Sequence, residues 1–336
     1  MQKNISIAID GGHSMFKVRA ALSSAPNTRI SLQIPTVVMP AILLTNEQTK
    51  LRAEGETVEL HGKKYFFGET ALRQGRSEVF TGQNSDWIES IQHDVLLLGA
   101  WFNVMREIGS GPARIHLVMG LPAKYLSAQK SLLRERVTAL LTPRLLPGQT
   151  LRVLIQSQAD APLQWISLDT DGALNKQTNL DSGAWGVIEI GHFTTDFALS
   201  EQGAMVEYAV ASCAGMNLAY EAIASALAAE RLPTALDVVE RAIRTREIKL
   251  FGKPQNVGAL VERAMAGFEA IVLDEANRIF GDKAATLDGI VVGGGGAELL
   301  FAKLRDRFPN AICDDNPRMM VAEGFCRLGL MSLSRV

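Results

Sequence analysis

The feature that most constrains the fold is a pair of similar segments, one in each half of the chain. Residues 186–199 read as two short apolar strands joined by a tight polar turn, and residues 7–18 have the same plan. In each segment a Gly-His pair begins two residues after an acidic residue, which is Asp10 in the first and Glu189 in the second. Such turns expose backbone N–H groups that can hold a phosphate. Two of them predict the two parts of one anion-binding site.

Acidic residues, hydroxyls and a lysine lie around these turns. Carboxylates suit a magnesium ion, which usually keeps several waters. The candidate metal ligands, acting through water, are Asp10, Asp196 and Glu189. The candidate phosphate ligands are Gly11, Gly12, His13, Ser14, Lys17, Gly191, His192, Thr194 and Thr195. A plainer interpretation stays open, in which the first hairpin carries only an exposed turn aspartate and a solvated lysine, and both histidines are ordinary turn residues.

Four consecutive glycines, Gly293, Gly294, Gly295 and Gly296, follow a predicted strand and precede a predicted helix. Without a Cβ, backbone can approach a ligand closely, and a helix N-terminus offers free N–H groups and a partial positive charge. The run therefore suits the ribose or phosphate of a nucleotide, or else it marks close packing of strand and helix. The patterns of the P-loop and of the Rossmann dinucleotide site are both absent from the sequence.

Strands alternate with helices along the chain, which predicts an α/β protein. Helices are expected at 84–107 behind the cap candidates Ser85 and Asp86, at 127–141, and from 217 to 229. Further helices are expected at 236–244 behind Thr234, at 257–280, at 297–308 and at 317–330, and a strand at 205–210. With 336 residues the chain is long enough for two domains.

Composition excludes several classes of protein. The net charge of −2 gives no global attraction to nucleic acid or to an anionic membrane, so neither is expected as a direct partner. Cys213, Cys313 and Cys326 are widely spaced without a CxxC pair, which favours reduced core thiols over disulfides or a zinc site. No apolar run reaches membrane-spanning length and no signal-peptide pattern opens the chain, so we expect a cytoplasmic protein.

The order of these parts resembles the actin-like ATPase superfamily shared by actin, Hsp70 chaperones and sugar kinases, and within it the plasmid-segregation actins of the ParM/StbA type. The resemblance spans nearly the whole chain. It rests on the two hairpin motifs, on the segment Gly293 to Glu298, and on smaller features at 61–69, 119–122 and 322–324. It implies two similar actin/Hsp70/ribonuclease-H-like domains with a nucleotide cleft between them, the first formed by 1–165 with 316–336 and the second by 166–315.

The resemblance also implies roles for single residues. Asp10 and Asp196 would serve a magnesium ion and the attacking water, and Lys17 the phosphates. Gln158, which follows a predicted strand, is either an ordinary loop residue or the group that orients the attacking water, as a glutamine does in some phosphoryl transfers. Gly215, the glycine run and Glu298 would contact the nucleoside.

The family implies ATP or GTP as ligand, slow hydrolysis, and filaments whose stability depends on the nucleotide and which join plasmid DNA through a DNA-binding adaptor.

The sequence departs from the family pattern at one place that matters. The second turn carries Glu189, His192 and Phe193 where the family has aspartate and glycines. Two alternatives therefore stay open: a nucleotide-binding scaffold that does not hydrolyse, and a small-molecule kinase on the same fold.

Overall fold

The computed structural model describes residues 2–75 and 86–335, which form two compact units. The first unit comprises 1–178 and 319–336, and the second comprises 179–318. The expected boundaries placed 166–178 in the second domain, whereas this segment belongs to the first unit. The reason is that it folds back on the end of α5 (Ala161–Ser167): Asn175 Nδ2 and Thr178 Oγ1 both donate to the Ile166 carbonyl, at 3.2 and 2.8 Å.

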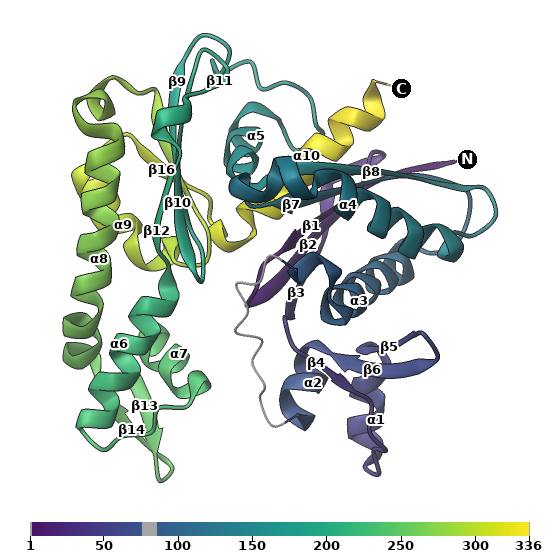
Figure 1. Ribbon diagram of the computed structural model, residues 1–336, viewed down its shortest axis with the longest axis horizontal. Helices are drawn as coiled ribbons and strands as arrows, with labels where there is room; N and C mark the ends of the chain where they lie inside the picture. Colours follow the sequence, from purple (N-terminus) through teal and green to yellow (C-terminus); the bar gives the residue numbers. More distant parts are fainter. Residues whose placement is uncertain (1, 76–85, 336) are drawn as a thin grey trace. The chain divides into compact units, whose positions relative to one another are not determined.

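The first unit is built on a five-stranded sheet in the order β3-β2-β1-β7-β8 (Figure 1). Its strands are β1 (Lys3–Gly11), β2 (Met15–Leu22), β3 (Ala25–Pro35), β7 (Ala113–Leu121) and β8 (Gln149–Ser157). The first three form an antiparallel meander, while β1, β7 and β8 run parallel. The carboxyl ends of these three parallel strands therefore meet at one edge of the sheet.

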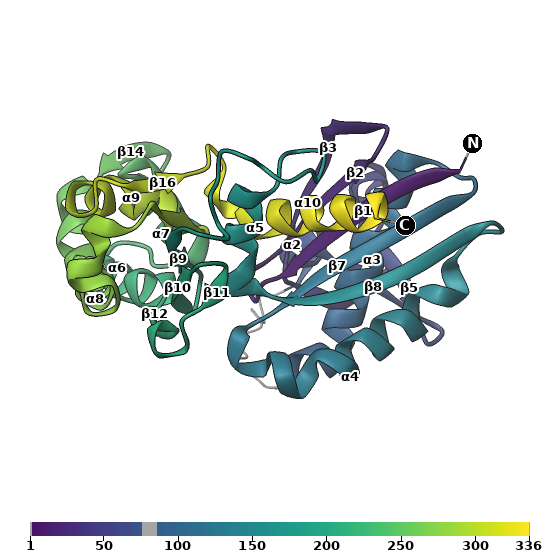
Figure 2. The same cartoon turned by 90° about the horizontal axis from the view of Figure 1, so that it is seen from above.

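Helices cover both faces of this sheet (Figure 2). Because side chains alternate along a strand, Ile5, Ile7 and Ile9 pack on one face with α3 (Ile91–Ile108) and α4 (Ala123–Leu141). On the other face, Ala8 and Val118 pack with α5 and with α10 (Met320–Ser334). The unit also has a three-stranded sheet and two short helices, which are β4 (Val38–Pro40), α1 (Glu47–Glu54), β5 (Thr57–Leu60), β6 (Lys63–Phe67) and α2 (Gly68–Gln74).

The second unit repeats the plan of the first. Its sheet has the order β11-β10-β9-β15-β16, with β12 also paired to β10. The strands are β9 (Ala184–Ile190), β10 (Thr194–Glu201), β11 (Ala204–Met205), β12 (Ala211–Ala214), β15 (Gly289–Gly293) and β16 (Ala311–Cys313). The hairpin β9–β10 corresponds to β1–β2, and β15 lies parallel to β9 as β7 lies parallel to β1. The predicted duplication of an α/β unit is thus confirmed.

The helices of the second unit bury one face of its sheet. They are α6 (Met216–Ala229), α7 (Leu236–Thr245), α8 (Gly258–Phe280) and α9 (Ala297–Arg307), with the hairpin β13 (Glu247–Leu250) and β14 (Lys253–Asn256) after α7. Ile188, Phe197 and Ile290 of the sheet pack against this layer. No helix within the described ranges is both long and apolar enough to cross a membrane.

Some element boundaries differ from the prediction. Helix α3 begins at Ile91, where Ser90 Oγ accepts from the His93 N–H at 3.1 Å, whereas Asp86 is the N-cap of a separate 3-10 helix, Trp87–Glu89. Ser85 lies outside the described residues. Thr234 does not cap α7, whose N-cap is Ala235. The predicted strand at 205–210 ends at Met205 and turns into a 3-10 helix, Glu207–Ala209.

The cysteines are free thiols, as predicted. Cys326 is buried in α10, and Cys213 and Cys313 are partly buried. Burial raises the pKa of each thiol to about 11, so all three are protonated and unreactive at neutral pH.

His116, on β7, makes the stability of the first unit depend on pH. Only 2% of its surface is exposed, and burial, with Arg152 and Arg114 nearby, lowers its pKa to about 4. Because the unfolded chain binds this proton near pH 6.5, stability should fall as pH drops from about 6.5 towards 4. We expect a loss of about 2 kcal/mol in unfolding free energy between pH 7.5 and pH 5 from this group.

Denaturant titrations at the two pH values measure that loss. His116→Asn should reduce the pH dependence by this amount. Equal pH dependence in wild type and His116→Asn would contradict the expectation.

Candidate functional site

Asp10 lies at the carboxyl end of β1, beside the ends of β7 and β8. It is 4% exposed, and its two oxygens accept from two side chains that the sequence analysis singled out. Gln158, which follows β8, donates from Nε2 to Oδ1 at 2.9 Å, and Lys17 donates from Nζ to Oδ2 at 2.8 Å. The structure therefore brings Asp10, Lys17 and Gln158 together at one edge of the sheet.

Lys17 reaches Asp10 because the two residues are direct partners across the β1–β2 hairpin. Both side chains are largely buried, with 12% of Lys17 and 5% of Asp10 exposed. A buried charge is costly unless it is paired, and this ion pair offsets that cost for both side chains. The plainer interpretation of an exposed aspartate and a solvated lysine is therefore wrong.

Thr36 forms two hydrogen bonds to the turn between β1 and β2. Its Oγ1 donates to the Gly12 carbonyl at 2.8 Å, and its N–H donates to the Ser14 carbonyl at 3.1 Å. Across residues 2–75 and 86–335, no partner accepts from the backbone N–H of Gly12 or Ser14. With the carbonyls fixed and N–H donors unused, the turn suits an anion.

His13, in the same turn, packs against an aromatic side chain. Its ring lies 5.5 Å from that of Trp87, which is itself buried. Burial lowers the pKa of His13, an effect that Asp10 opposes and Lys124 reinforces. His13 is thus neutral at pH 7, and its ring packing agrees with the plainer interpretation of this histidine as a structural turn residue.

In the second unit, Asp196 lies at the start of β10, directly across from Glu189 of β9. Thr194 Oγ1 donates to Asp196 Oδ2 at 2.9 Å, and Ser212 of β12 donates to Oδ1. Thr195 points the other way: it is fully buried, and its hydroxyl donates to the Ala214 carbonyl at 3.0 Å. The structure therefore groups Asp196, Glu189 and Thr194, and it buries Thr195 away from them.

The second turn is joined to the N-terminus of α6. The N–H groups of Met216 and Asn217 donate to the carbonyls of Gly191 and His192, at 3.0 and 2.7 Å. The first N–H groups of α6 are therefore already used by the turn. A Cβ on Gly215 would lie 2.5 Å from the Thr194 nitrogen, so Gly215 serves this close approach of helix and turn.

His192 and Phe193 occupy the positions where the family pattern has glycines. The His192 ring lies 4.6 Å from that of Phe193 and 5.5 Å from that of Tyr220 on α6. Both residues are only partly buried. The side chains that replace the glycines are thus packed on one another and on α6 at the edge of the turn.

The glycine run lies against the second hairpin. Gly293 pairs with Glu189 in the sheet, and the Gly296 N–H donates to the Ile190 carbonyl at 3.0 Å. Gly294 has a φ of 88°, and its Cβ would lie 2.4 Å from the Ile190 oxygen. Packing alone therefore explains Gly294 and Gly296. Gly295 and, in the first turn of α9, Glu298 reach the surface of this unit.

The residues present fit magnesium held through water and phosphate. Among the described side chains, no group of three or more His, Cys, Asp or Glu residues is placed to bind a metal by itself. The two units instead offer a single carboxylate, Asp10, and a facing pair, Asp196 and Glu189. Magnesium is often bound by one or two carboxylates together with substrate phosphates, so this donor set suits it.

Four residues of these two regions were not found from the sequence: Thr36 and Ser212, which support the first turn and Asp196, and Gly120 and Phe325, which lie beside Gln158. Only Gly120 carried a signal, because it stands in a Gly-Leu-Pro turn after a strand. Thr36, Ser212 and Phe325 come from distant elements with no local pattern.

Two duplicated α/β units, each with an acidic residue and a polar turn at the same edge of its sheet, define a two-domain actin-like fold. Two family models agree with this class. One, described as the N-terminal domain of actin-like proteins, matches residues 8–157, and the other, described as the C-terminal domain of an archaeal MreB-like actin homologue, matches residues 187–306. Both models describe domains of actin-like proteins, and together they match most of the chain.

Solved structures show the same fold at low sequence identity. The ParM of a 15-stranded filament from Clostridium botulinum is 19% identical, with a TM-score of 0.71 over 98% of this chain and 99% of that one. The pSK41 ParM protein without nucleotide is 15% identical, with a TM-score of 0.70 over 99% and 98%. Ta0583, an archaeal actin homologue, is 13% identical, with a TM-score of 0.70 over 99% and 100%. None of the curated proteins matches this sequence.

Proposed function

We propose that this chain binds one nucleoside triphosphate, ATP or GTP, with Mg²⁺ through the turns of both hairpins, and forms filaments whose stability the nucleotide controls. The observation that carries the proposal is the repeated arrangement of a carboxylate and a polar turn at the strand ends of both units. The fold adds support, because a similar structure is described as a ParM filament. Head-to-tail contacts between copies of a chain generate an open filament when the rotation between copies does not close into a ring.

Each polar group has a defined part in this proposal. The free N–H groups of Gly12 and Ser14, with Lys17, bind phosphate oxygens. Asp10 and Asp196 hold waters of the magnesium ion, which neutralises charge on the phosphates when it is bound. Gln158, already hydrogen-bonded to Asp10 at 2.9 Å, orients the attacking water. Gly295, which is partly exposed, and Glu298, which is exposed, contact the nucleoside.

The filament would act in the cytoplasm by moving plasmid DNA through a DNA-binding adaptor. The net charge of −2 favours an adaptor over direct binding of DNA by this chain. The same fold in two ParM proteins supports this finer part of the proposal.

Sedimentation tests the proposal. Purified protein is centrifuged with ATP, GTP, ADP or no nucleotide, each with Mg²⁺, and phosphate release is followed in parallel. We expect most of the protein in the pellet with one of the triphosphates and a soluble chain without nucleotide. A soluble protein under all conditions would contradict filament formation. Sugar-dependent ADP release without polymer would favour the kinase alternative.

A nucleotide-binding scaffold without hydrolysis remains the second candidate, favoured by the second turn. Both oxygens of Asp196 already accept from hydroxyls, and His192 and Phe193 bring packed rings where the family has glycines. A scaffold would bind triphosphate and polymerise but release no phosphate. Polymer that persists for hours with ATP and without phosphate release would support it.

A further inference from the structure

Gln158 is the first residue of a short 3-10 helix, Gln158–Asp160, which joins β8 to α5. Its side chain is free to rotate about three bonds, so the hydrogen bond from its amide to Asp10 requires something to fix the rotamer. A side chain that positions a reacting water needs this restriction, because a displacement of about 1 Å can cost about 100-fold in rate. The surroundings of Gln158 show which residues supply it.

Gly120 is glycine for reasons of space. It lies in β7 and its φ is not positive, so the backbone there would accept other residues. A Cβ at this position, however, would lie 2.7 Å from Gln158 Cγ and 2.7 Å from an edge carbon of the Phe325 ring. The stem of Gln158 and the ring of Phe325 thus both lie directly over Gly120.

The Phe325 ring is the second group that lies over Gly120. It belongs to α10 and is fully buried on the face of the sheet that carries Ala8 and Val118. Helix α10 also approaches the segment after Gln158 closely, because a Cβ on Gly324 would lie 2.1 Å from the Ala161 carbonyl oxygen. Helix α10 therefore places the Phe325 ring over Gly120, beside the stem of Gln158, and packs tightly on the helix that follows Gln158.

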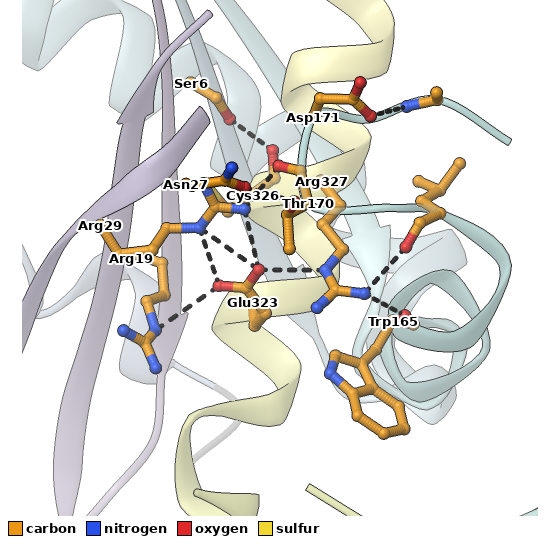
Figure 3. Close-up of polar contacts among 12 residues, drawn as sticks. Ser6, Arg19, Asn27, Arg29, Trp165, Thr170, Asp171, Glu323, Cys326 and Arg327 are labelled. Atoms are coloured by element: carbon orange, nitrogen blue, oxygen red, sulfur yellow. Dashed lines mark hydrogen bonds and ion pairs between the residues drawn. The ribbon is translucent and has the colours of Figure 1, made fainter. Parts of the chain in front are cut away.

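Glu323 fixes α10 in this place (Figure 3). Arg29 of β3 binds its carboxylate through two nitrogens, at 2.9 and 3.1 Å, and Arg327 binds it at 3.0 Å. Arg327 also donates to the carbonyls of Trp165 and Leu168 at the end of α5, at 2.5 and 2.8 Å. One carboxylate thus ties α10 to the sheet, and through Arg327 to α5.

Glu323 is ionised at neutral pH. Burial alone would raise its pKa, but hydrogen bonds from Arg29 and Arg327 outweigh burial and hold the pKa below its usual value. The ion pairs of Glu323 with Arg29 and Arg327 therefore persist at any pH well above 4.5.

We propose that Gly120 and Phe325 are positioning residues for Gln158. The ion pairs of Glu323 with Arg29 and Arg327 keep Phe325 in place. Gly120 leaves room for the stem of Gln158, and Phe325 limits where that stem can go, so its amide points at Asp10. The catalytic consequence rests on the proposed hydrolysis, whereas the effect on the Gln158 side chain does not depend on it.

Gly120→Ala tests the proposal. The added methyl group displaces Gln158, so we expect kcat for triphosphate hydrolysis to fall about 10- to 100-fold. The nucleotide Kd should stay within about twofold, because the phosphate-binding groups named above are unchanged. Adding Phe325→Leu to Gly120→Ala should restore part of kcat by giving back the space. Gly267→Ala is the matched control, since a Cβ at this exposed helical position meets nothing within 4 Å.

A second readout is independent of catalysis. The side-chain amide signals of Gln158 in selectively labelled protein are assigned by their loss in Gln158→Ala. We expect slow solvent exchange of these protons in wild type and faster exchange in Gly120→Ala. Phe325→Leu alone should also speed exchange. This variant replaces Gly120→Ala in the exchange experiment if Gly120→Ala does not fold.

The two readouts separate the possible failures. Unchanged exchange and unchanged kcat in Gly120→Ala would overturn the positioning role. A wild type that hydrolyses nothing, but whose Gln158 amide loses protection in Gly120→Ala, would overturn the proposed hydrolysis and support the positioning role. A fall in melting temperature with unchanged Gln158 exchange would show that Gly120 serves packing alone, which also overturns the inference.

Discussion

Asp196→Ala is expected to lower the single-turnover rate of triphosphate hydrolysis by about 100-fold. The carboxylate lies at the turn of the second hairpin, across from Glu189, and is held by Thr194 and Ser212. Two oriented hydroxyls fix the group that we assign to the metal-bound and attacking waters. Its removal deletes that group, while Lys17 and the first turn, which we propose to bind phosphate, are left unchanged. Quenched-flow measurement with enzyme in excess gives the rate of the chemical step.

Asp282→Ala is the control for that experiment, because Asp282 is an exposed acid of the same unit. It should hydrolyse at the wild-type rate. Equal rates in wild type and Asp196→Ala would remove the assigned mechanism. No measurable hydrolysis in either protein, together with tight nucleotide binding, would favour the scaffold.

Gly294→Ala is expected to destabilise the second unit by about 4 kcal/mol or more, the range in which a single substitution points to a definite structural cause. Two costs add. The φ of 88° is unfavourable for any residue with a Cβ, and that Cβ would lie 2.4 Å from the Ile190 backbone oxygen. Backbone on both sides cannot move cheaply, because Gly296 N–H also bonds to Ile190.

Hydrogen exchange followed by mass spectrometry measures this effect unit by unit. Amides of β9 and β15 should exchange about 1,000-fold faster in Gly294→Ala, which corresponds to about 4 kcal/mol at 1.4 kcal/mol per factor of ten. Gly267→Ala, in α8, should slow exchange slightly, because alanine in a helix is about 0.5–1 kcal/mol more favourable than glycine. Unchanged exchange in Gly294→Ala would show that the turn can rearrange to accept a Cβ.

The general architecture could be predicted from the sequence because its signals are local. Alternating strands and helices, and the repeated segments at 7–18 and 186–199, predicted two similar α/β units with hairpins at their centres. Helices such as α8 showed their apolar periodicity clearly. Some boundaries were predicted less well, as at α3, which begins later than expected because the Ser90 side chain caps it.

The first half of the candidate site could be predicted in the same way, and parts of the second could not. Asp10 and Lys17 face each other because they are partners in one hairpin, a relation that spacing reveals. Thr195 looked like Thr194, but strand alternation turns it into the core, where its hydroxyl bonds to Ala214. The glycines at 215, 294 and 296 were predicted as nucleotide contacts, and at each of them the structure also shows a close tertiary contact that leaves no room for a Cβ.

Contacts between elements that lie far apart in the sequence could not be predicted from any local pattern. Thr36 supports the first turn across 24 residues of sequence, and Phe325 reaches Gly120 from the last helix. Such contacts depend on how strands and helices pack, and one sequence contains no pattern for them. Glu323 was noticed only as part of an Ala-Glu-Gly segment, and its ion pairs with Arg19, Arg29 and Arg327 appear only in the fold.

The central proposal is that residues of both hairpins contribute to triphosphate binding, and calorimetric titration with a non-hydrolysable ATP or GTP analogue and Mg²⁺ tests it most directly. We predict one site per chain for the preferred base, weakened at least tenfold both by Lys17→Ala in the first unit and by Asp196→Ala in the second. Binding that either substitution leaves unchanged, or two independent sites per chain, would contradict the account.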